Sequence, residues 1–394
     1  TGVQTCALPI WAADYLMKKG IIQRVLVVCP LSIMKAAWQQ DLFKTAMHRT
    51  VGLAHGVAVK RKQVLAEKTE FVIINYDGIE IVEDEIKNGG FDLVVVDEAN
   101  YVKTTSTRRW KSLNRVLKKD TWLWLMTGTP AAQSPADAYG LAKLVNPASV
   151  PKYAGTFKEM VMQKVSQFTW IPRYNAQDIV YKTLQPAIRY TKEECLDLPD
   201  VLYTTREIDL TPQQDKYYKK LKKDRYLAAA GEEITVVNAG VMLTKLLQVS
   251  AGSIYSDTGE IIEFDVSNRM LALREIITEA SHKVLVFCPF RHSIEKIMAE
   301  LPKHGITCAA IHGDISMNER SEIFKNFQEK KDPMVLIIQP QAASHGVTLH
   351  AANVVVFWSP VMSVETYIQC CARRSEEHTS ELQSRLHLVC RLLL

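Results

Sequence analysis

The sequence predicts an α/β protein with two lobes, each a mostly parallel sheet flanked by helices, and a helical linker region between them. Short apolar runs alternate with amphipathic stretches of helix length, which is typical of parallel sheets covered on both faces. The alternation occurs in both halves of the chain. With 394 residues, of which 47% are hydrophobic, the chain is long enough to bury a core in each lobe.

Eight apolar runs are predicted as strands, because loop or turn residues follow each of them. Those of the first half are RVLVVCP (24–30), FVIINYD (71–77), LVVVDEA (93–99) and WLWLMTGTP (122–130). Those of the second half are KVLVFCP (283–289), CAAIHGD (308–314), MVLIIQP (334–340) and NVVVFWSP (353–360). The similarity of VLVVCP to VLVFCP indicates either related lobes or a chance match between buried strands.

The region from about Thr191 to Asp265 is predicted as a linker followed by helices that pack on the second lobe. It is rich in lysine in QQDKYYKKLKKDRY and then apolar at helical spacing in VVNAGVMLTKLLQ. We interpret the lysine cluster as a solvated helix face, with a nucleic-acid contact as the alternative.

The composition sets only broad limits on function. A formal charge of +5 is compatible with an anionic partner but is far below that of a dedicated basic tail. Eight scattered cysteines without a Cys-x-x-Cys pair indicate reduced thiols in a cytoplasmic protein. No apolar run approaches the roughly 20 residues that span a bilayer, so we expect a soluble protein with no membrane partner.

Two carboxylates, Asp97 and Glu98, come at the end of the run LVVVDEA. Ligands of open parallel sheets bind beyond the carboxyl ends of the strands. An aspartate there can hold Mg²⁺ through its water shell, and the following glutamate can orient or deprotonate the attacking water in phosphoanhydride hydrolysis. The alternative is an ordinary acidic loop after a buried strand.

Other polar residues follow the remaining strands. Thr127 and Thr129 in MTGTP can sense a neighbouring nucleotide or simply belong to a tight turn. Gln369 and Arg373, four residues apart, share one face of a predicted helix, where a guanidinium can meet phosphate charge; a lone arginine on a helix is more often a surface charge.

Two further motifs are interpreted as structural. SPAD (134–137) has a capping serine followed by proline at the first helical position. In HGDISMNERSE (312–322), His312 and Asp314 have no further metal ligands nearby in the sequence, so a metal-dependent nuclease is only a distant alternative. In the same motif, Ser316 and Glu319 form a capping box.

The order and spacing of these motifs resemble the Snf family of helicase-like ATPases, within helicase superfamily two. The resemblance extends from about Trp11 to Arg373. The matching stretches include VLVVCPLSIMKAAWQQDL, VVVDEANYVKTTST, LMTGTPAAQSPADAYGLAKLVNP, LQPAIRYTKEECLDLPD, VLVFCPFRHSIEKI, ASHGVTLHAANVVVFWSP and ETYIQCCAR. LMTGTPAAQSPADAYGLAKLVNP is the most specific of these matches.

The resemblance implies two RecA-like lobes that clamp ATP and Mg²⁺ and move along double-stranded DNA through its backbone phosphates. It assigns catalysis to Asp97, Glu98, Gln369 and Arg373, with Arg373 as the arginine finger. It assigns coupling between ATP and DNA to Thr127, Gly128, Thr129, Asn100 and Gly346. It assigns DNA contacts to Pro30, Ser32, Lys103 and His345.

The sequence departs from the family pattern at several places. Asn100 stands where the family usually has histidine, and Ala343 and Ser344 replace a glycine pair. The stretch TGVQTCALPI stands where the family has its phosphate loop, yet it has no lysine and only one glycine. After Arg373 the family pattern, including a second arginine, does not continue.

These departures lead to the expectation that residues 1–10 and 374–394 are non-native, adapter-derived segments. We then expect a first lobe at 11–198 without its phosphate loop, linker and helices at 199–265, and an incomplete second lobe at 266–373. The parent protein is expected to be an ATP-dependent double-stranded DNA translocase of a bacterial or phage-infected cell, and this chain is expected to hydrolyse ATP barely or not at all. The alternatives are a strand-separating DNA or RNA helicase and a nucleotide-independent binding module.

Overall fold

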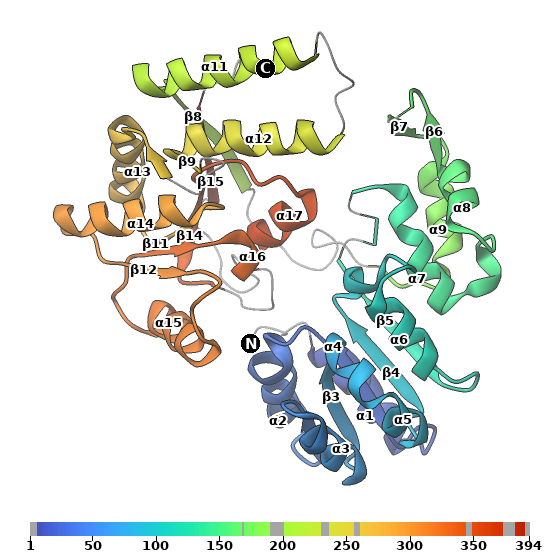
Figure 1. The fold of residues 1–394 in the computed structure, drawn as a ribbon. Coiled ribbons are helices and arrows are strands. Elements are labelled where there is room, and N and C mark those ends of the chain that lie inside the picture. The colour runs from blue at the N-terminus through green and yellow to red at the C-terminus, as the bar shows by residue number, and fades with distance from the viewer. Residues whose placement is uncertain are drawn as a thin grey trace. The chain divides into compact units, whose positions relative to one another are not determined.

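The computed structural model describes residues 6–128, 130–131, 133–167, 169–189, 201–229, 236–255, 261–343, 349–372 and 383–390 (Figure 1). The chain divides into two compact units, Thr1–Tyr190 and Thr191–Leu394, and each is described by itself.

The first unit is built on a five-stranded parallel sheet in the order β2-β3-β1-β4-β5. Its strands are β1 (Val25–Cys29), β2 (Val51–Ala54), β3 (Phe71–Asn75), β4 (Leu93–Asp97) and β5 (Trp122–Met126). Four of these strands fall within the predicted runs. The edge strand β2 was not predicted, because four residues that include a glycine give too weak a pattern.

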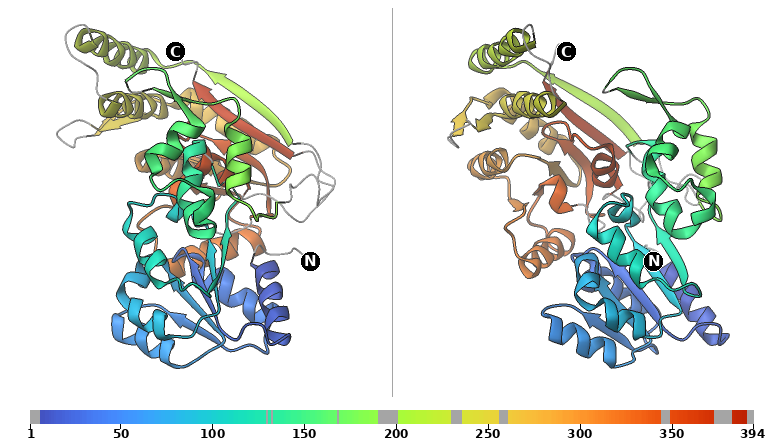
Figure 2. Two further views of the ribbon diagram at one scale, coloured as in Figure 1. Left: turned by 90° about the vertical axis from the view of Figure 1, so that its right-hand side faces the viewer. Right: turned by 45° about the vertical axis from the view of Figure 1, so that its right-hand side comes forward.

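Helices cover both faces of this sheet (Figure 2). Those before β4 are α1 (Ala7–Lys18), the π-helix η1 (Met34–Gln39), α2 (Gln40–Thr45), α3 (Ala58–Ala66), α4 (Tyr76–Ile79), the 3₁₀ turn η2 (Glu80–Val82) and α5 (Glu83–Asn88). After β4 come η3 (Ala99–Val102), α6 (Arg108–Val116), η4 (Pro135–Asp137), α7 (Ala138–Val145) and η5 (Pro147–Ser149). Helices α8 (Ala154–Val161) and α9 (Ala176–Thr183) form a separate apolar cluster with α7. A short antiparallel hairpin, β6 (Met162–Lys164) and β7 (Trp170–Pro172), lies between α8 and α9.

The side-chain alternation of the strands divides the core of the first unit into two layers. On β1, Val25 and Val27 pack with α1, η1 and α2, whereas Leu26 and Val28 pack with α3 to α7. This follows from the two-residue period of a strand, which sends successive side chains to opposite faces. Because both faces of the central strands β1, β3 and β4 are buried, these strands are apolar up to their last residue, as the sequence predicted.

Helix α1 begins at Ala7, four residues before Trp11, where the family resemblance begins. The reason is packing, because Ala7, Ile10 and Ala13 are buried at helical spacing. Pro9 is tolerated because it lies in the first turn, where its missing N–H has no intrahelical partner.

The second unit contains a six-stranded parallel sheet in the order β12-β13-β11-β14-β15-β8. Its strands are β8 (Val201–Ile208), β11 (Lys283–Phe287), β12 (Cys308–Ile311), β13 (Val335–Ile338), β14 (Ala352–Phe357) and β15 (Gln383–Cys390). A hairpin, β9 (Ser253–Tyr255) and β10 (Ile261–Glu263), lies outside this sheet. The helices are α11 (Pro212–Ala229), α12 (Val236–Ala251), α13 (Ser267–Glu279), α14 (Arg291–Glu300), the 3₁₀ turn η6 (Leu301–His304), α15 (Met317–Glu329), α16 (Pro340–Ala343) and α17 (Val364–Ala372).

The second unit therefore confirms the predicted strands β11 to β14 and the expected helices α11 and α12. Two strands were not predicted. Strand β8 comes from the region interpreted as a linker, and β15 comes from the segment in which the family pattern does not continue. Both pair in parallel with their neighbours, and β15 lies between β14 and β8.

The fold class is thus the predicted one, with a mostly parallel sheet flanked by helices in each unit. Among the helices of the described residues, none combines the length and the apolar character needed to cross a bilayer. The described cysteines, Cys6, Cys29, Cys288, Cys308, Cys370 and Cys371, are all free thiols, as expected.

Candidate functional site

The candidate site of the first unit lies at the carboxyl ends of its central strands. The chain continues from β1 through β2 to β3 on one side and then returns on the other side as β4. Strands β1 and β4 therefore flank the switch point of the sheet, which is where open α/β sheets bind ligands. Asp97 is the last residue of β4, and Cys29 is the last residue of β1.

The Asp97 carboxylate is held by two fixed donors. The indole Nε1 of Trp38, in η1, donates to Oδ2 at 2.8 Å, and the backbone N–H of Glu98 donates to Oδ1 at 2.9 Å. Burial raises the pKa of Asp97, while the bonds from Trp38 and the Glu98 N–H oppose this rise because they stabilise the ionised form. Asp97 is therefore a desolvated carboxylate in a fixed orientation.

The backbone turns sharply after Asp97, because Glu98 adopts the left-handed conformation with φ 53° and ψ 53°. A non-glycine residue pays for this conformation in strain, so the surroundings must hold it. The hydroxyl of Tyr76, in α4, donates to the carbonyl of Asp97 at 2.6 Å and to that of Glu98 at 3.1 Å. Tyr76 is buried and stacks on Tyr101 with ring centroids 5.2 Å apart.

Asn100 and Thr127 join two strand ends. The Thr127 hydroxyl, directly after β5, donates to Oδ1 of Asn100 in η3 at 2.8 Å. Asn100 is only 9% exposed. Gly128 follows in an exposed turn, where an added Cβ would meet nothing within 4 Å. The amide at position 100 therefore provides the acceptor that links the turn after β4 to the end of β5.

Lys103 lies just after η3, and its Nζ pairs with Oδ2 of Asp137 at 3.2 Å. Helix α7 approaches this turn closely, because a Cβ at Gly140 would collide with the carbonyl of Lys103. The capping role predicted for Ser134 is confirmed, since its side chain accepts from the N–H of Ala136 at the start of η4.

Pro30 and Ser32 lie in the loop between β1 and η1. Pro30 is buried, and Ser32 is partly buried with an Oγ that has no hydrogen-bond partner among the described residues. This loop leads directly into the segment that carries Trp38.

Asp97 and its surroundings fit a magnesium ion held through water. Each carboxylate oxygen accepts one bond from the protein and retains a second lone pair for a water of the ion's shell. The first turn of α1, with the capping residue before it, fits a phosphate cradle less well. The Cys6 thiol is buried there and is hydrogen-bonded to Asp41, and residues 6–10 contain no lysine.

In the second unit, Gln369 lies in α17 and is partly buried. The other site residues predicted there, His345, Gly346 and Arg373, lie outside the described residues, as does Thr129 of the first unit. Among the described residues, no group of three His, Cys, Asp or Glu side chains could hold a metal ion. Asp314 pairs with Arg291, and Ser316 caps α15 by accepting from the N–H of Glu319.

The structure adds two site residues that sequence reasoning missed, Trp38 and Tyr76. Trp38 lies 59 positions and Tyr76 21 positions from Asp97 along the chain, so their contacts depend on tertiary structure. Their side chains gave one clue in the sequence. A buried tryptophan N–H or tyrosine O–H usually has a hydrogen-bond partner, so an aromatic residue of this kind at an apolar core position points to a polar contact.

Two family models match this chain. The sequence model described as SNF2-related domain matches residues 3–253, and the model described as helicase conserved C-terminal domain matches residues 268–375. The first match alone covers more than half of the chain.

Curated relatives are similar over most of this chain. An uncharacterised ATP-dependent helicase of Mycoplasma genitalium is 24% identical over 87% of this chain, which spans only 32% of that relative. A putative protein of Acyrthosiphon pisum secondary endosymbiont phage 1 is 21% identical over 88% of this chain and 77% of the relative. Among solved structures, the SWI2/SNF2 ATPase core of Sulfolobus solfataricus in complex with dsDNA is 20% identical, with a TM-score of 0.44, over 97% of this chain and 80% of that one.

Proposed function

Because the chain belongs to the SNF2-related family of helicase-like proteins, we propose that it acts as part of an ATP-driven translocase on double-stranded DNA. The observation that carries the proposal is the fixed orientation of the Asp97 carboxylate at the switch point of the first sheet. One of its oxygens accepts a hydrogen bond from the Trp38 indole and the other accepts one from the backbone N–H of Glu98. This arrangement supports a role in holding Mg²⁺ with ATP.

The proposed chemistry is hydrolysis of the terminal phosphoanhydride. Bound Mg²⁺ would neutralise phosphate charge, and Asp97 would hold its water shell. Glu98, placed next to Asp97 by the left-handed turn, would orient and deprotonate the attacking water. The bonds from Tyr76 support this assignment because they hold the two carbonyls of the turn.

We assign coupling to the link between Asn100 and Thr127, with Gly128 and Thr129 next to it in sequence. Hydrolysis changes charge near Asp97, and a hydrogen bond from the following turn to the end of β5 can transmit a shift of that turn. This proposal gives Asn100 the role that the family usually gives to histidine.

For the second unit we propose that Gln369 and Arg373 serve the same reaction and that Gly346 serves its coupling to DNA, as the family resemblance implies. A guanidinium from Arg373 would stabilise the charge that develops on the transferred phosphoryl group, an effect of about a thousandfold or more in related enzymes.

We further propose that DNA is held mainly by its phosphates, with contacts from Pro30, Ser32, Lys103 and His345. Binding should then depend weakly on sequence and steeply on salt. Residues 1–10 contain no lysine, which leads us to propose that this chain hydrolyses ATP barely or not at all, since phosphate loops use a lysine on the terminal phosphates.

The first test compares the chain with a variant in which residues 1–10 are replaced by a glycine-rich loop that ends in Lys-Thr. We expect both to bind duplex DNA, and only the variant to show DNA-stimulated ATP turnover. Asp97→Asn or Glu98→Gln in that variant should reduce turnover at least a hundredfold while duplex binding is retained.

The second test compares triplex displacement with strand displacement by the same variant. A translocase displaces the third strand of a triplex without separating the duplex. A strand-separating helicase gives a positive result in both the triplex-displacement and the strand-displacement assay. Duplex binding that is insensitive to ATP, together with no turnover in the variant, would overturn the proposal in favour of a binding module.

A further inference from the structure

Helix α11 carries a row of lysines on the side that faces away from the core of the second unit. Lys216, Lys219, Lys220 and Lys223 follow one another at spacings of three and four residues, and all four are exposed. Because an α-helix completes a turn every 3.6 residues, these spacings place the four side chains on one face. We call these four residues the lysine row.

The opposite face of α11 anchors the helix to its unit. Gln214 and Tyr218 are buried. The side-chain amide of Gln214 donates to the carbonyl of Val249 in α12 at 2.8 Å. Tyr217 packs edge-on against Phe264, with ring centroids 5.2 Å apart. The lysine row is therefore presented by a helix in a fixed orientation within the second unit.

The stretch that contains the lysine row has a surplus of positive charge. Residues 211–225 contain six basic residues and two aspartates, a surplus of four in a chain whose formal charge is +5. Asp215 pairs with Lys219 at 2.6 Å. The other three lysines of the row form no ion pair among the residues that the structure describes.

Lysines on other helices of this chain have acidic partners close by. Lys18 pairs with Asp14 one turn earlier in α1, and Lys325 pairs with Glu329 one turn later in α15. Such mixed charges are typical of a solvated helix face. The lysine row departs from this pattern, so the ligand that complements it is anionic.

We propose that the lysine row binds the phosphate backbone of double-stranded DNA. Lys216 and Lys223 lie seven residues apart, which corresponds to about 10.5 Å along the helix axis. One strand of B-DNA carries a phosphate about every 3.4 Å of the duplex axis, so about three phosphates pass over that length. The inference rests on the proposed function for the class of polymer and adds that the second unit holds the duplex through α11.

Other anionic polymers fit the lysine row less well. An unpaired strand is usually held by exposed aromatic rings on which its bases stack. Tyr217 and Tyr218 turn toward the core instead. An acidic protein surface usually adds apolar or aromatic anchors, and none of the described side chains of α11 is both large, apolar and exposed. Cations in a row without either feature suit duplex phosphates.

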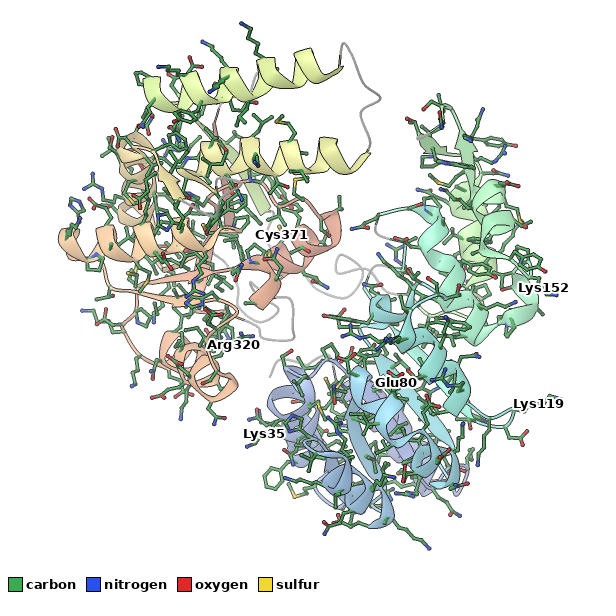
Figure 3. The ribbon with its side chains drawn as sticks, in the orientation of Figure 1. Lys35, Glu80, Lys119, Lys152, Arg320 and Cys371 are labelled. Atoms are coloured by element: carbon green, nitrogen blue, oxygen red, sulfur yellow. The ribbon has the colours of Figure 1, made fainter. Side chains whose placement is uncertain are left out.

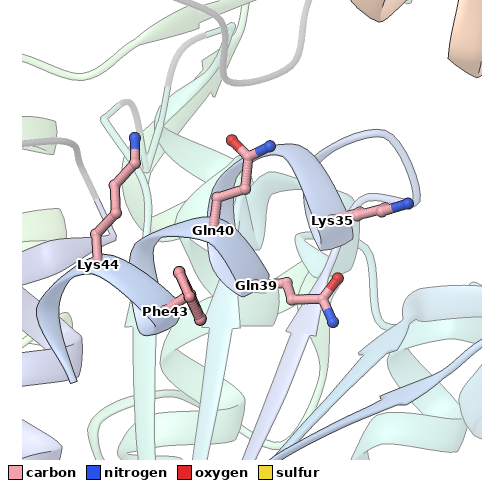
Figure 4. A pocket seen from close by; sticks show the side chains of 5 residues that line it. All are labelled: Lys35, Gln39, Gln40, Phe43 and Lys44. Atoms are coloured by element: carbon pink, nitrogen blue, oxygen red, sulfur yellow. The ribbon is translucent and has the colours of Figure 1, made fainter. Parts of the chain in front are cut away.

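Positive charge on η1 and α2 of the first unit is arranged differently. A shallow hollow of about 290 Å³ there is lined by Lys35, Gln39, Gln40, Phe43 and Lys44. Figure 4 shows Lys35 and Lys44 at opposite ends of this segment, with the side chain of Phe43 extending away from that of Lys44. These two cations therefore do not form a row like that of α11.

The test measures binding of a fluorescein-labelled DNA duplex by fluorescence anisotropy over a range of salt concentrations. One variant carries Lys216→Gln, Lys220→Gln and Lys223→Gln, which remove three charges from exposed positions. A second variant carries Lys216→Arg, Lys220→Arg and Lys223→Arg, which keep the charge and the ability to bind phosphate. Lys219 is left unchanged in both variants because it pairs with Asp215.

The matched control removes three lysine charges from the first unit. It carries Lys118→Gln, Lys119→Gln and Lys152→Gln, all at exposed positions. Figure 3 shows Lys119 and Lys152 projecting from that unit. Lys103→Gln is a further comparison, because Lys103 belongs to the DNA contacts of the proposed function. Urea unfolding of each variant checks that it is folded.

We expect the glutamine variant of the lysine row to bind the duplex about tenfold or more weakly than the unaltered chain at moderate salt. The plot of log K against log salt should become shallower by about 2.7, because each of three lost phosphate contacts contributes about 0.9. The arginine variant and the matched control should bind within about twofold of the unaltered chain. The loss should be the same for duplexes of different sequence, because phosphates carry no sequence information.

A footprint of the unaltered chain tests the same contact without any substitution. Bound duplex should protect Lys216, Lys220 and Lys223 from an amine-modifying reagent and should leave Lys119 and Lys152 reactive. Mass spectrometry reads the extent of modification at each lysine. Equal reactivity of the lysine row with and without bound duplex would overturn the inference.

The remaining outcomes contradict the inference in distinguishable ways. Unchanged duplex binding by the glutamine variant of the row, with weaker binding by Lys103→Gln, overturns the inference and leaves the proposed function standing. Equal losses in that variant and in the matched control show an effect of net charge and not of the row. A glutamine variant that loses binding of a polyglutamate peptide but not of the duplex makes the row a protein contact. If the unaltered chain binds no duplex, the inference and the proposed function fail together.

Discussion

The hydroxyl of Thr127 donates a 2.8 Å hydrogen bond to Oδ1 of Asn100, and this bond joins the turn after β4 to the end of β5. The sequence alone leaves the role of Asn100 open, because the family resemblance implies histidine there. The structure resolves its geometry, since the asparagine amide offers an acceptor to the strand next to it. The carboxylate of Asp97 is three residues away along the same turn.

The first prediction concerns the energy of this bond. In a double-mutant cycle of Asn100→Ala and Thr127→Val, we expect a coupling of about 1 kcal/mol in urea unfolding, because a buried acceptor loses its donor. A cycle of Asn100→Ala with Thr45→Val is the control, since the Thr45 hydroxyl bonds within its own helix. Additive effects in both cycles would show that the 2.8 Å contact contributes no stability.

The second prediction concerns Trp38 and the titration of Asp97. Trp38→Phe removes a donor that stabilises the ionised carboxylate, so the pKa of Asp97 should rise further. The measurement is a carbon-13 NMR titration of the aspartate carboxyls, with Asp97→Asn to identify the signal. Trp110→Phe is the matched control, because its indole donates to the carbonyl of Gly140 at 2.9 Å. An unchanged Asp97 titration in Trp38→Phe contradicts the assignment.

The third prediction concerns Asp41, a carboxyl buried in α2. Burial raises the pKa of Asp41 to about 6, with Lys44 and the Cys6 thiol opposing the rise. The folded chain then holds more protons than the unfolded chain between about pH 4 and pH 6, so this group's stabilising contribution is present below pH 4 and is lost as the pH rises through 6. Titration of Asp41 therefore lowers the free energy of unfolding by at most about 3 kcal/mol, because a change of one in the pKa corresponds to about 1.4 kcal/mol.

The Asp41→Asn variant should therefore gain stability relative to the unaltered chain as the pH is raised from 4.5 to 7. Urea unfolding at several pH values measures this difference. Asp120→Asn, at an exposed aspartate, is the control and should leave the pH dependence unchanged. Parallel stability curves for Asp41→Asn and the unaltered chain would refute the titration of Asp41 near pH 6.

The fourth prediction has the opposite sign and concerns Asp14 in α1. Although burial raises the pKa of Asp14, hydrogen bonds from Lys18, Arg49 and His48 hold it well below its usual range. Its stabilising contribution is present above the unfolded-state value near pH 4 and is lost as the pH falls below it.

Asp14→Asn should cost about 1–3 kcal/mol of unfolding free energy at pH 7, because Arg49 loses a charged partner in a partly buried position. This loss of unfolding free energy should become smaller as the pH is lowered. For Asp41→Asn, by contrast, the gain in stability relative to the unaltered chain should grow as the pH is raised. A cost that is independent of pH would mean that packing, not charge, explains the effect.

The sequence predicted the central strands because they are buried on both faces, which leaves an uninterrupted apolar run such as Val25–Cys29. It missed strands whose burial is decided elsewhere in the chain. Strand β8 (VLYTTREI) has four consecutive polar or charged residues and lies in a stretch that looks like a linker, yet it pairs with β15 from far along the chain. Pairing partners at such separation leave no local pattern.

The candidate site, like the strands, was predicted only in part from the sequence. The sequence by itself determined that a carboxylate pair ends a buried strand at Asp97 and Glu98, because a polar residue after an apolar run is a local signal. Only the tertiary structure decided that Trp38 and Tyr76 hold this turn and that Asn100 meets Thr127. The physical reason is that hydrogen bonds need atoms within about 3 Å, and chain folding alone brings residues that are 59 or 27 positions apart to that distance.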